Sequence, residues 1–312
     1  MSDFHAHHHE RSRLATRAAI ASVAVALLLL ALKAWAAYST HSMAMLGSLA
    51  DTGLDVIASV VTLAGVRIAA LPADSDHRFG HGKAEALVAL FQVALIAVSA
   101  VWIAYSSVKR LMAGAEISAA PLGIGVSLVA MAATLALIAY QRRVVTQTGS
   151  VAIAADRAHY QSDLLLNVSV IAALGLDQFS GLVGADAVFG LLIAAWLLFG
   201  ALRASAKSIN QLMDREWPDA ERAAFLAAAA EFPELEGLHD LRTRTSGSHH
   251  FVQFHVWVPG DWTVREAHDR LDPIDEALQA RFPRTEILIH LDPHGHTDRE
   301  TMLPSSLTEK SR

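Results

Sequence analysis

Apolar residues are concentrated in the first two thirds of the chain, in long and nearly uninterrupted stretches. Each stretch holds about 20 mostly apolar residues, the length that an α-helix needs to cross the hydrocarbon core of a membrane. Beyond residue 208 the hydropathy falls and polar positions become regular. The pattern predicts six transmembrane helices, at residues 16–38, 43–71, 84–112, 121–141, 151–174 and 183–206.

The last third of the chain has the pattern of a small α+β domain. Residues 218–232 are typical of an amphipathic helix bounded by prolines, and residues 239–245 and 251–258 are typical of strands joined by a Ser-Gly-Ser turn. Residues 264–281 predict a second helix and residues 286–291 a third strand. This order predicts a small open sheet with helices on one face.

The two patterns divide the chain into four parts. We expect a polar, His-rich tail at residues 1–13, a transmembrane domain at 14–207, a soluble domain at 208–293 and a disordered tail at 294–312. The first tail contains four histidines, and a disordered segment is the plainer interpretation, with metal collection as the alternative.

Basic residues indicate how the helices are oriented, because cytoplasmic loops carry an excess of Lys and Arg. Most of them fall at one face of the predicted bundle, and Lys109 and Arg110 fall at the other. We therefore expect a six-pass membrane protein with both termini in the cytoplasm. The residues on the majority side are Arg11, Arg13, Arg17, Arg67, Arg78, Lys83, Arg142, Arg143, Arg203 and Lys207.

Composition limits the chemistry that the chain can perform. The 312 residues include 16 His and no Cys, so disulfides and thiolate metal sites are excluded. Metal ligands would have to come from His, Asp and Glu, which suit zinc, iron(II), manganese or cobalt better than copper(I). The net charge is -6, and no part of the sequence has the basic pattern typical of nucleic-acid binding.

Four residues that can bind metal lie within the apolar segments: Asp51 and Asp55 in one, His159 and Asp163 in another. Each pair is spaced i,i+4, so both side chains face the same side of a helix. A charged side chain at the bilayer centre costs roughly 2.5 to 3.5 kcal/mol on insertion scales, so such groups need partners. The four residues, here called the membrane cluster, predict a tetrahedral site for a divalent metal. Polar contacts between helices are the alternative.

Two further groups lie outside the apolar segments. The loop cluster is Asp74, His77 and His81, between the second and third predicted helices. The C-terminal cluster is His239, His255, His268, His290 and Asp292. From spacing alone, ordinary surface residues are the default interpretation of both, although His290 and Asp292 share one face of a strand.

Six segments resemble the cation diffusion facilitators, and most closely their bacterial zinc and iron efflux branch. They are GSLADTGLDV (47–56), PADSDHRFGHGKAEAL (72–87), DRAHYQSDLLLN (156–167), LMDREWPD (212–219), HDLRTRTSG (239–247) and ILIHLDP (287–293). The resemblance implies six transmembrane helices, a cytoplasmic metallochaperone-like (ferredoxin-like) α+β domain, and a homodimer that exchanges divalent cations for protons.

The resemblance also assigns roles to residues. It implies that the membrane cluster is the transport site, the loop cluster a second metal site, and the C-terminal cluster a binuclear cytoplasmic site. Lys83 and Asp214 resemble salt-bridge partners at the hinge of the dimer. Leu291 departs from the family, since a polar residue is common there, and so does the His-rich start.

These features together predict a transporter and no enzyme. Metal ligation requires deprotonated carboxylates and a neutral imidazole, so metal and protons compete for one site, with His159 as the expected proton carrier. We expect export of Zn2+, with Cd2+, Fe2+, Co2+ or Mn2+ as other candidates; the metal is substrate and regulatory ligand, and no separate cofactor is expected. A membrane-anchored metal sensor or scaffold and a passive channel are the alternatives.

Overall fold

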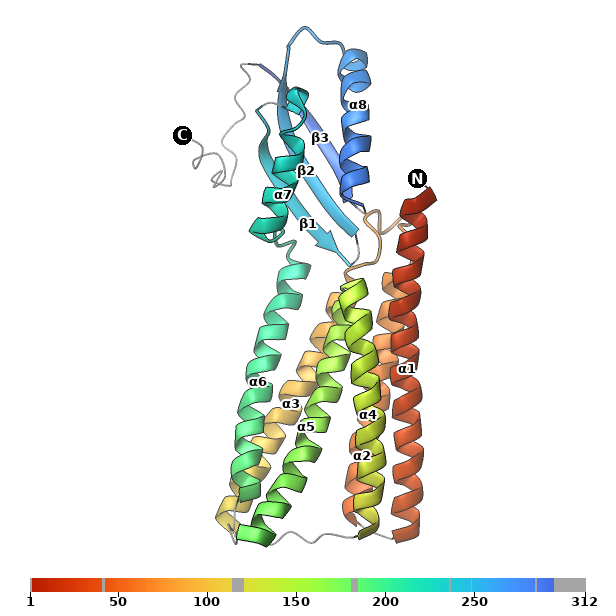
Figure 1. Ribbon diagram of the computed structural model, residues 1–312, viewed down its shortest axis with the longest axis vertical. Helices are drawn as coiled ribbons and strands as arrows, with labels where there is room; N and C mark the ends of the chain where they lie inside the picture. The colour runs from red at the N-terminus through yellow and green to blue at the C-terminus, as the bar shows by residue number, and fades with distance from the viewer. Residues whose placement is uncertain are drawn as a thin grey trace. The chain divides into compact units, whose positions relative to one another are not determined.

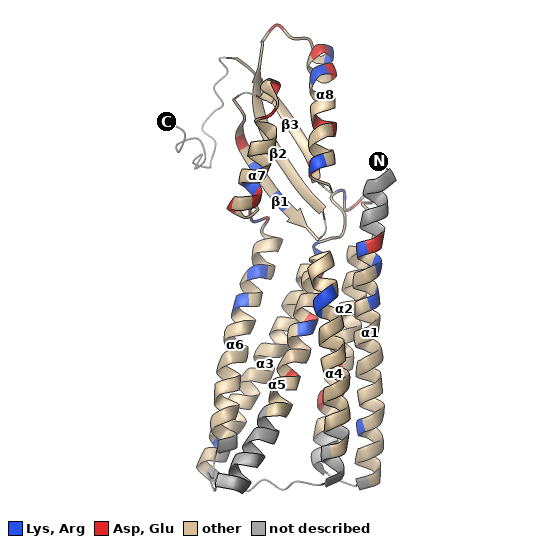
Figure 2. Cartoon of the chain, in the orientation of Figure 1, with Lys and Arg blue, Asp and Glu red and all other residues tan. Residues whose placement is uncertain are grey.

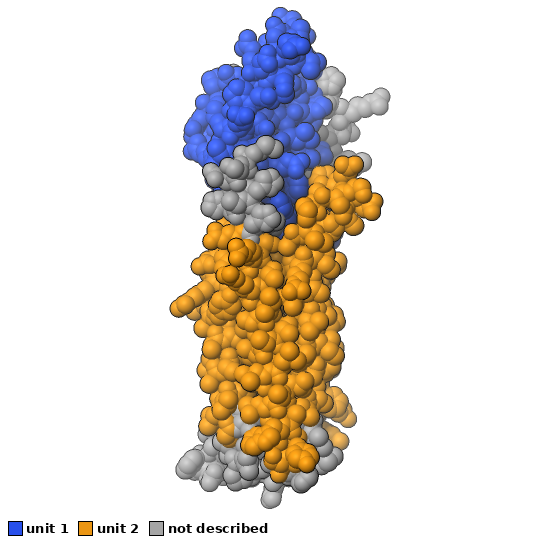
Figure 3. All heavy atoms as spheres, turned by 90° about the vertical axis from the view of Figure 1, so that its right-hand side faces the viewer, with its two compact units in different colours: residues 1–8, 213–312 blue, residues 9–212 orange. Residues whose placement is uncertain are grey.

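The computed structural model describes residues 2–40, 43–113, 121–180, 185–235, 237–247, 249–283 and 285–294. It divides into two compact units, coloured separately in Figure 3. Residues 9–212 form the helical unit, and residues 213–312, grouped with residues 1–8, form the C-terminal unit. Of the expected tail at residues 294–312, residues 295–312 lie outside the described residues.

The helical unit contains six long helices among its described residues (Figure 1). The expected tail at residues 1–13 is helical from Ser2 onward, which corrects the interpretation of this segment as disordered. No Pro or Gly occurs between Ser2 and Thr40, so nothing interrupts the helix that the apolar segment forms. The helices are α1 (Ser2–Thr40), α2 (Met43–Ala69), α3 (Ala84–Ala113), α4 (Pro121–Thr148), α5 (Val151–Ser180) and α6 (Ala185–Leu212).

Five of the helices have described segments long and apolar enough to cross a membrane. They lie in α1, α2, α3, α4 and α6. In α5 the first half carries Asp156, Arg157 and Asp163, which lower its hydropathy, and the sixth crossing stays a prediction. Lys and Arg gather toward one end of the helical unit (Figure 2), as the positive-inside rule requires.

Small residues let the helices approach closely. Ala15, Ala18 and Ala19 of α1 pack in one buried cluster with residues of α2, α3, α4 and α5. A Cβ at Gly65 of α2 would collide with Val88 of α3, so glycine is required where these two helices meet. Such contacts replace the hydrophobic effect as the source of helix association within lipid.

The C-terminal unit is built around a three-stranded sheet with the order β1-β2-β3. Strand β2 pairs antiparallel with β1 and parallel with β3. Alternate β2 residues Val252, Phe254 and Val256 are buried in one core with Phe225 of α7 and Leu278 of α8, so both helices cover the same face of the sheet. The elements are α7 (Asp219–Ala229), a short 3-10 turn (Pro233–Leu235), β1 (His239–Ser246), β2 (His249–Val258), α8 (Val264–Arg281) and β3 (Thr285–Pro293).

Candidate metal sites

Three residues of the membrane cluster converge from two helices. Asp55 on α2 and His159 and Asp163 on α5 offer ligand atoms that all lie within 4.8 Å of one another. The Nε2 atom of His159 is 3.1 Å from the Asp55 carboxylate and 3.8 Å from that of Asp163. His159 is buried, while Asp55 and Asp163 are half-buried. The i,i+4 spacing on α5 and the packing of α5 against α2 produce this group.

Asp51 lies one helical turn before Asp55 and is exposed in the single chain. It is not among the residues whose ligand atoms meet in that group. Its carboxylate does interact electrostatically with that of Asp55. Its place as the fourth ligand of the membrane cluster therefore stays a prediction.

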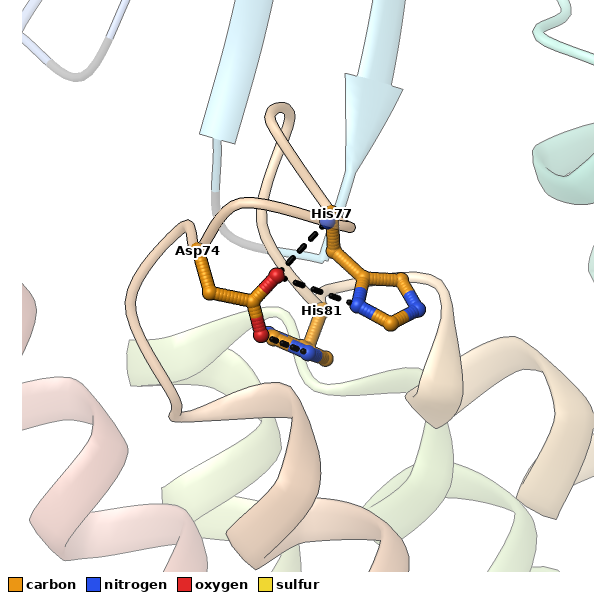
Figure 4. A group of neighbouring side chains, drawn as sticks. All are labelled: Asp74, His77 and His81. Atoms are coloured by element: carbon orange, nitrogen blue, oxygen red, sulfur yellow. Dashed lines mark hydrogen bonds and ion pairs between the residues drawn. The ribbon is translucent and has the colours of Figure 1, made fainter.

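The loop cluster forms a compact group between α2 and α3. The imidazole rings of His77 and His81 both turn toward the Asp74 carboxylate (Figure 4), at 3.2 and 3.3 Å. Hydrogen bonds from the backbone N–H of His77, and then of Asp76, hold the pKa of Asp74 below its ordinary value. Gly80, with a φ of 74°, supplies the left-handed turn that brings His81 back to the other two.

The C-terminal cluster is centred on Asp292. His239 of β1, His255 of β2 and Asp292 of β3 offer ligand atoms within 4.8 Å of one another. The β1 to β2 register places His239 opposite His255, and β3 brings Asp292 beside them. Burial alone would raise the pKa of Asp292, but the hydrogen bond from His255 and the nearby imidazoles lower it. Asp240, which we did not predict, lies 3.8 Å from His255.

The other two members of this cluster lie outside that group. His290 is 3.4 Å from the second oxygen of Asp292, and its ring is 4.4 Å from that of His255. His268 lies on the exposed side of α8 and is 3.1 Å from Asp272. Both keep the status of predicted ligands.

The predicted hinge residues have contacts of their own within each unit. Lys83 donates a hydrogen bond to the carbonyl of Leu212, and Asp214 is 3.9 Å from Arg244. The ion pair between Lys83 and Asp214 stays a prediction.

A buried carboxylate that we did not predict lies on α5 three residues before His159. Asp156 is fully buried and accepts hydrogen bonds from Ser22 of α1 at 2.6 Å, Gln141 of α4 at 2.7 Å and Gln92 of α3 at 3.1 Å. We call these four residues the Asp156 hub. An Asp and two Gln within apolar segments were the signal in the sequence, because each needs a partner there.

Comparison with known proteins accounts for both units. A sequence profile described as "Cation efflux transmembrane domain" matches residues 19–213, which is more than half of the chain. A second, described as "Cation efflux protein, cytoplasmic domain", matches residues 217–294. The chain belongs to the cation efflux family. The family, also called the cation diffusion facilitators, consists of transporters and not of enzymes, so the resemblance found in the sequence is confirmed.

Full-length relatives support this membership. The cation-efflux pump FieF of Cronobacter sakazakii is 41% identical over 285 residues, which cover 91% of this chain and 95% of that one. The pump of the same name from Klebsiella pneumoniae is 41% identical over 281 residues, covering 90% and 93%. A structure of the transporter CzrB in its zinc form is 38% identical and covers 28% of this chain and 99% of that one, with a TM-score of 0.24. That score is too low for the match to show the fold.

Proposed function

We propose that this member of the cation efflux family is a proton-coupled antiporter that exports divalent metal ions from the cytoplasm by alternating access. It would work as a homodimer of six-pass subunits in the bacterial inner membrane, with both termini in the cytoplasm. The observation that carries the proposal is the meeting of Asp55, His159 and Asp163 within the helical unit.

The ligands of the membrane cluster favour a borderline divalent cation. Carboxylate oxygen and imidazole nitrogen suit Zn2+, and Cd2+, Fe2+, Co2+ and Mn2+ can use the same atoms. We propose Zn2+ as the main substrate, because zinc binds tetrahedrally to carboxylate oxygen and imidazole nitrogen. Asp51 would supply the fourth ligand.

Coupling to protons follows from the same atoms. A metal ion binds only when Asp55 and Asp163 are ionised and His159 is neutral, so binding releases protons and proton binding releases the metal. If the site opens in turn to the two sides of the membrane, this competition links export of metal to import of protons. His159 would carry the proton, because imidazole titrates near neutral pH.

The C-terminal cluster would regulate transport. Metal bound by His239, His255 and Asp292 can favour one arrangement of the dimer only through a difference in affinity between arrangements. The match to the family's cytoplasmic domain supports a dimer held in part by this unit. The loop cluster, with three ligands near the end of α2, would be an additional site of metal binding.

The decisive experiment measures zinc uptake into proteoliposomes with an imposed pH gradient. We expect the gradient to drive uptake by the native chain, and Asp55→Ala or His159→Ala to abolish it, because either change removes a ligand. Asp261→Asn is the matched control: it also removes one carboxylate, at an exposed residue that belongs to none of the three clusters, and should transport normally. Asp292→Ala should retain gradient-driven uptake at a reduced rate when zinc is scarce.

Each of the other outcomes would indicate a different function for this protein. Uptake that ignores the gradient would mean a passive channel. No uptake of Zn2+, Cd2+, Fe2+, Co2+ or Mn2+ by a folded dimer would mean a membrane-anchored sensor. Full transport by Asp55→Ala would place the transport site elsewhere.

A further inference from the structure

A lysine lies within the apolar span of the first helix. Lys33 is half-buried on α1, inside the membrane-crossing segment Glu10–Ser39. Its ammonium donates a hydrogen bond to the hydroxyl of Thr52 on α2 at 2.7 Å. A cation at membrane depth is costly and marks a functional site by default.

The geometry at Thr52 fixes the direction of this contact. Thr52 is buried, and its hydroxyl donates to the carbonyl of Ser48 at 3.1 Å. The oxygen of Thr52 is therefore free to accept from Lys33. The ammonium is held in place by a neutral group, with no carboxylate bound to it directly among the contacts described for this helix.

Thr52 places that charge beside the membrane cluster. It follows Asp51 in α2 and precedes Asp55 by three residues, so it lies within one helical turn of both. The charge of Lys33 interacts electrostatically with Asp51 and with Asp163 across the site. A helix that supplies no predicted ligand thus supplies a positive charge.

We propose that Lys33 sets the metal affinity of the membrane cluster, by stabilising the carboxylates when the site is empty and repelling the divalent ion when it is full. The inference rests on the proposed transport function and extends it. A transporter needs a site that binds metal from the cytoplasm and then releases it. The charge of Lys33 opposes overly tight binding, because Coulomb repulsion between a unit and a divalent charge at helix-packing distances changes a binding constant by about tenfold or more.

The test compares three substitutions by zinc uptake into proteoliposomes at about pH 8, where few protons compete. Lys33→Gln keeps a hydrogen-bond donor for Thr52 and removes the charge. We expect its KM for zinc to fall by about tenfold, with a lower kcat because the metal leaves more slowly. Lys33→Arg keeps the charge and should restore both values. Thr52→Val removes the hydrogen bond but keeps the charge, so it should change KM by less than Lys33→Gln does.

A purely structural link between α1 and α2 gives a different result. In that case Thr52→Val would change transport as much as Lys33→Gln does. The changes in KM and kcat would then follow the loss of the hydrogen bond and not the loss of the charge. An unchanged KM in a folded Lys33→Gln, or the same KM change in Thr52→Val, would overturn the inference. Should Lys33→Gln fail to fold, Lys33→Met provides a second uncharged variant of similar length. Failure of the native chain to transport would refute the proposed function instead.

Discussion

Asp156 shows what can and cannot be predicted at the scale of one residue. The sequence shows a carboxylate three positions before His159. Because burying a carboxylate within a membrane costs free energy, the residue must have hydrogen-bonding partners. Its donors, Ser22, Gln92 and Gln141, come from three helices. Their pairing depends on how four helices pack, which periodicity cannot supply. The i,i+4 pairs of the membrane cluster were predictable because each pair lies on a single helix.

Loss of the Asp156 carboxylate should destabilise the helical unit. Asp156→Ala removes the charged acceptor that three buried donors share, although each donor keeps a second acceptor. We expect a loss of about 3 kcal/mol. Thermal unfolding of the full chain in detergent measures this. Ser162→Ala is the matched control, because among the described residues this buried hydroxyl bonds only to Ala158 of its own helix; it should cost about 1 kcal/mol. Equal losses of stability in the two variants would contradict the stabilising role assigned to the Asp156 hub.

At the scale of elements, local sequence determined some boundaries and not others. The predicted helix 264–281 coincides with α8, which begins at a capping box formed by Thr263 and Glu266. Helix α4 continues to Thr148, beyond the predicted end at residue 141, because the apolar pattern stops at the membrane surface while the helix does not. The start of α1 was missed for the same reason. Hydropathy indicates which part of a helix lies in an apolar environment. The ends of a helix depend instead on capping residues and on helix-breaking residues.

The capping box of α8 makes a prediction about pH. Hydrogen bonding from the Thr263 backbone N–H and hydroxyl holds the pKa of Glu266 below its ordinary 4.5. A lowered pKa in the folded state stabilises the protein above pH 4.5, and that stability is lost as pH falls through the lowered value. Thr263 is also the N-cap of α8, and loss of a Thr cap costs about 1 kcal/mol, so Thr263→Ala should lower the free energy of unfolding at neutral pH. The difference in free energy of unfolding between Thr263→Ala and the native chain should become smaller below pH 4.5.

Denaturant unfolding of a fragment of residues 213–312 across this pH range provides the measurement. Val264→Ala is the neighbouring control, since Val264 is 89% exposed and takes no part in the capping box. Its effect should be small and the same at every pH. A difference for Thr263→Ala that stays constant down to acid pH would contradict the role assigned to Glu266.

At the scale of the whole molecule, the number of membrane crossings depends on whether α5 crosses the membrane. Family membership and five apolar helices support a transmembrane protein, and the sixth crossing decides on which side the C-terminal unit lies. Hydropathy is low in α5 because this helix carries Asp156, Arg157 and Asp163. The helix that hydropathy does not identify is thus the one that carries the predicted ligands His159 and Asp163.

The absence of cysteine from all 312 residues permits a direct test by single-cysteine labelling. Gln147→Cys before α5 and Met213→Cys after α6 both occupy exposed positions. If α5 crosses the membrane, an impermeant maleimide should reach both from the cytoplasmic side, in inverted vesicles and not in intact cells. Ser39→Cys, at the far end of α1, should show the opposite pattern. Labelling of Gln147→Cys and Met213→Cys from opposite sides would mean that α5 does not cross.

Asp156, His159 and Asp163 lie on one continuous helix, and this restricts how α5 can move. Rotation of α5 about its own axis would carry the Asp156 carboxylate away from Ser22, Gln92 and Gln141 at once. Tilting about Asp156 would keep those bonds while shifting Asp163, two turns farther along, relative to Asp55. Helix α5 can therefore tilt more easily than it can rotate, with the hub as the pivot and Asp163 on the part that moves.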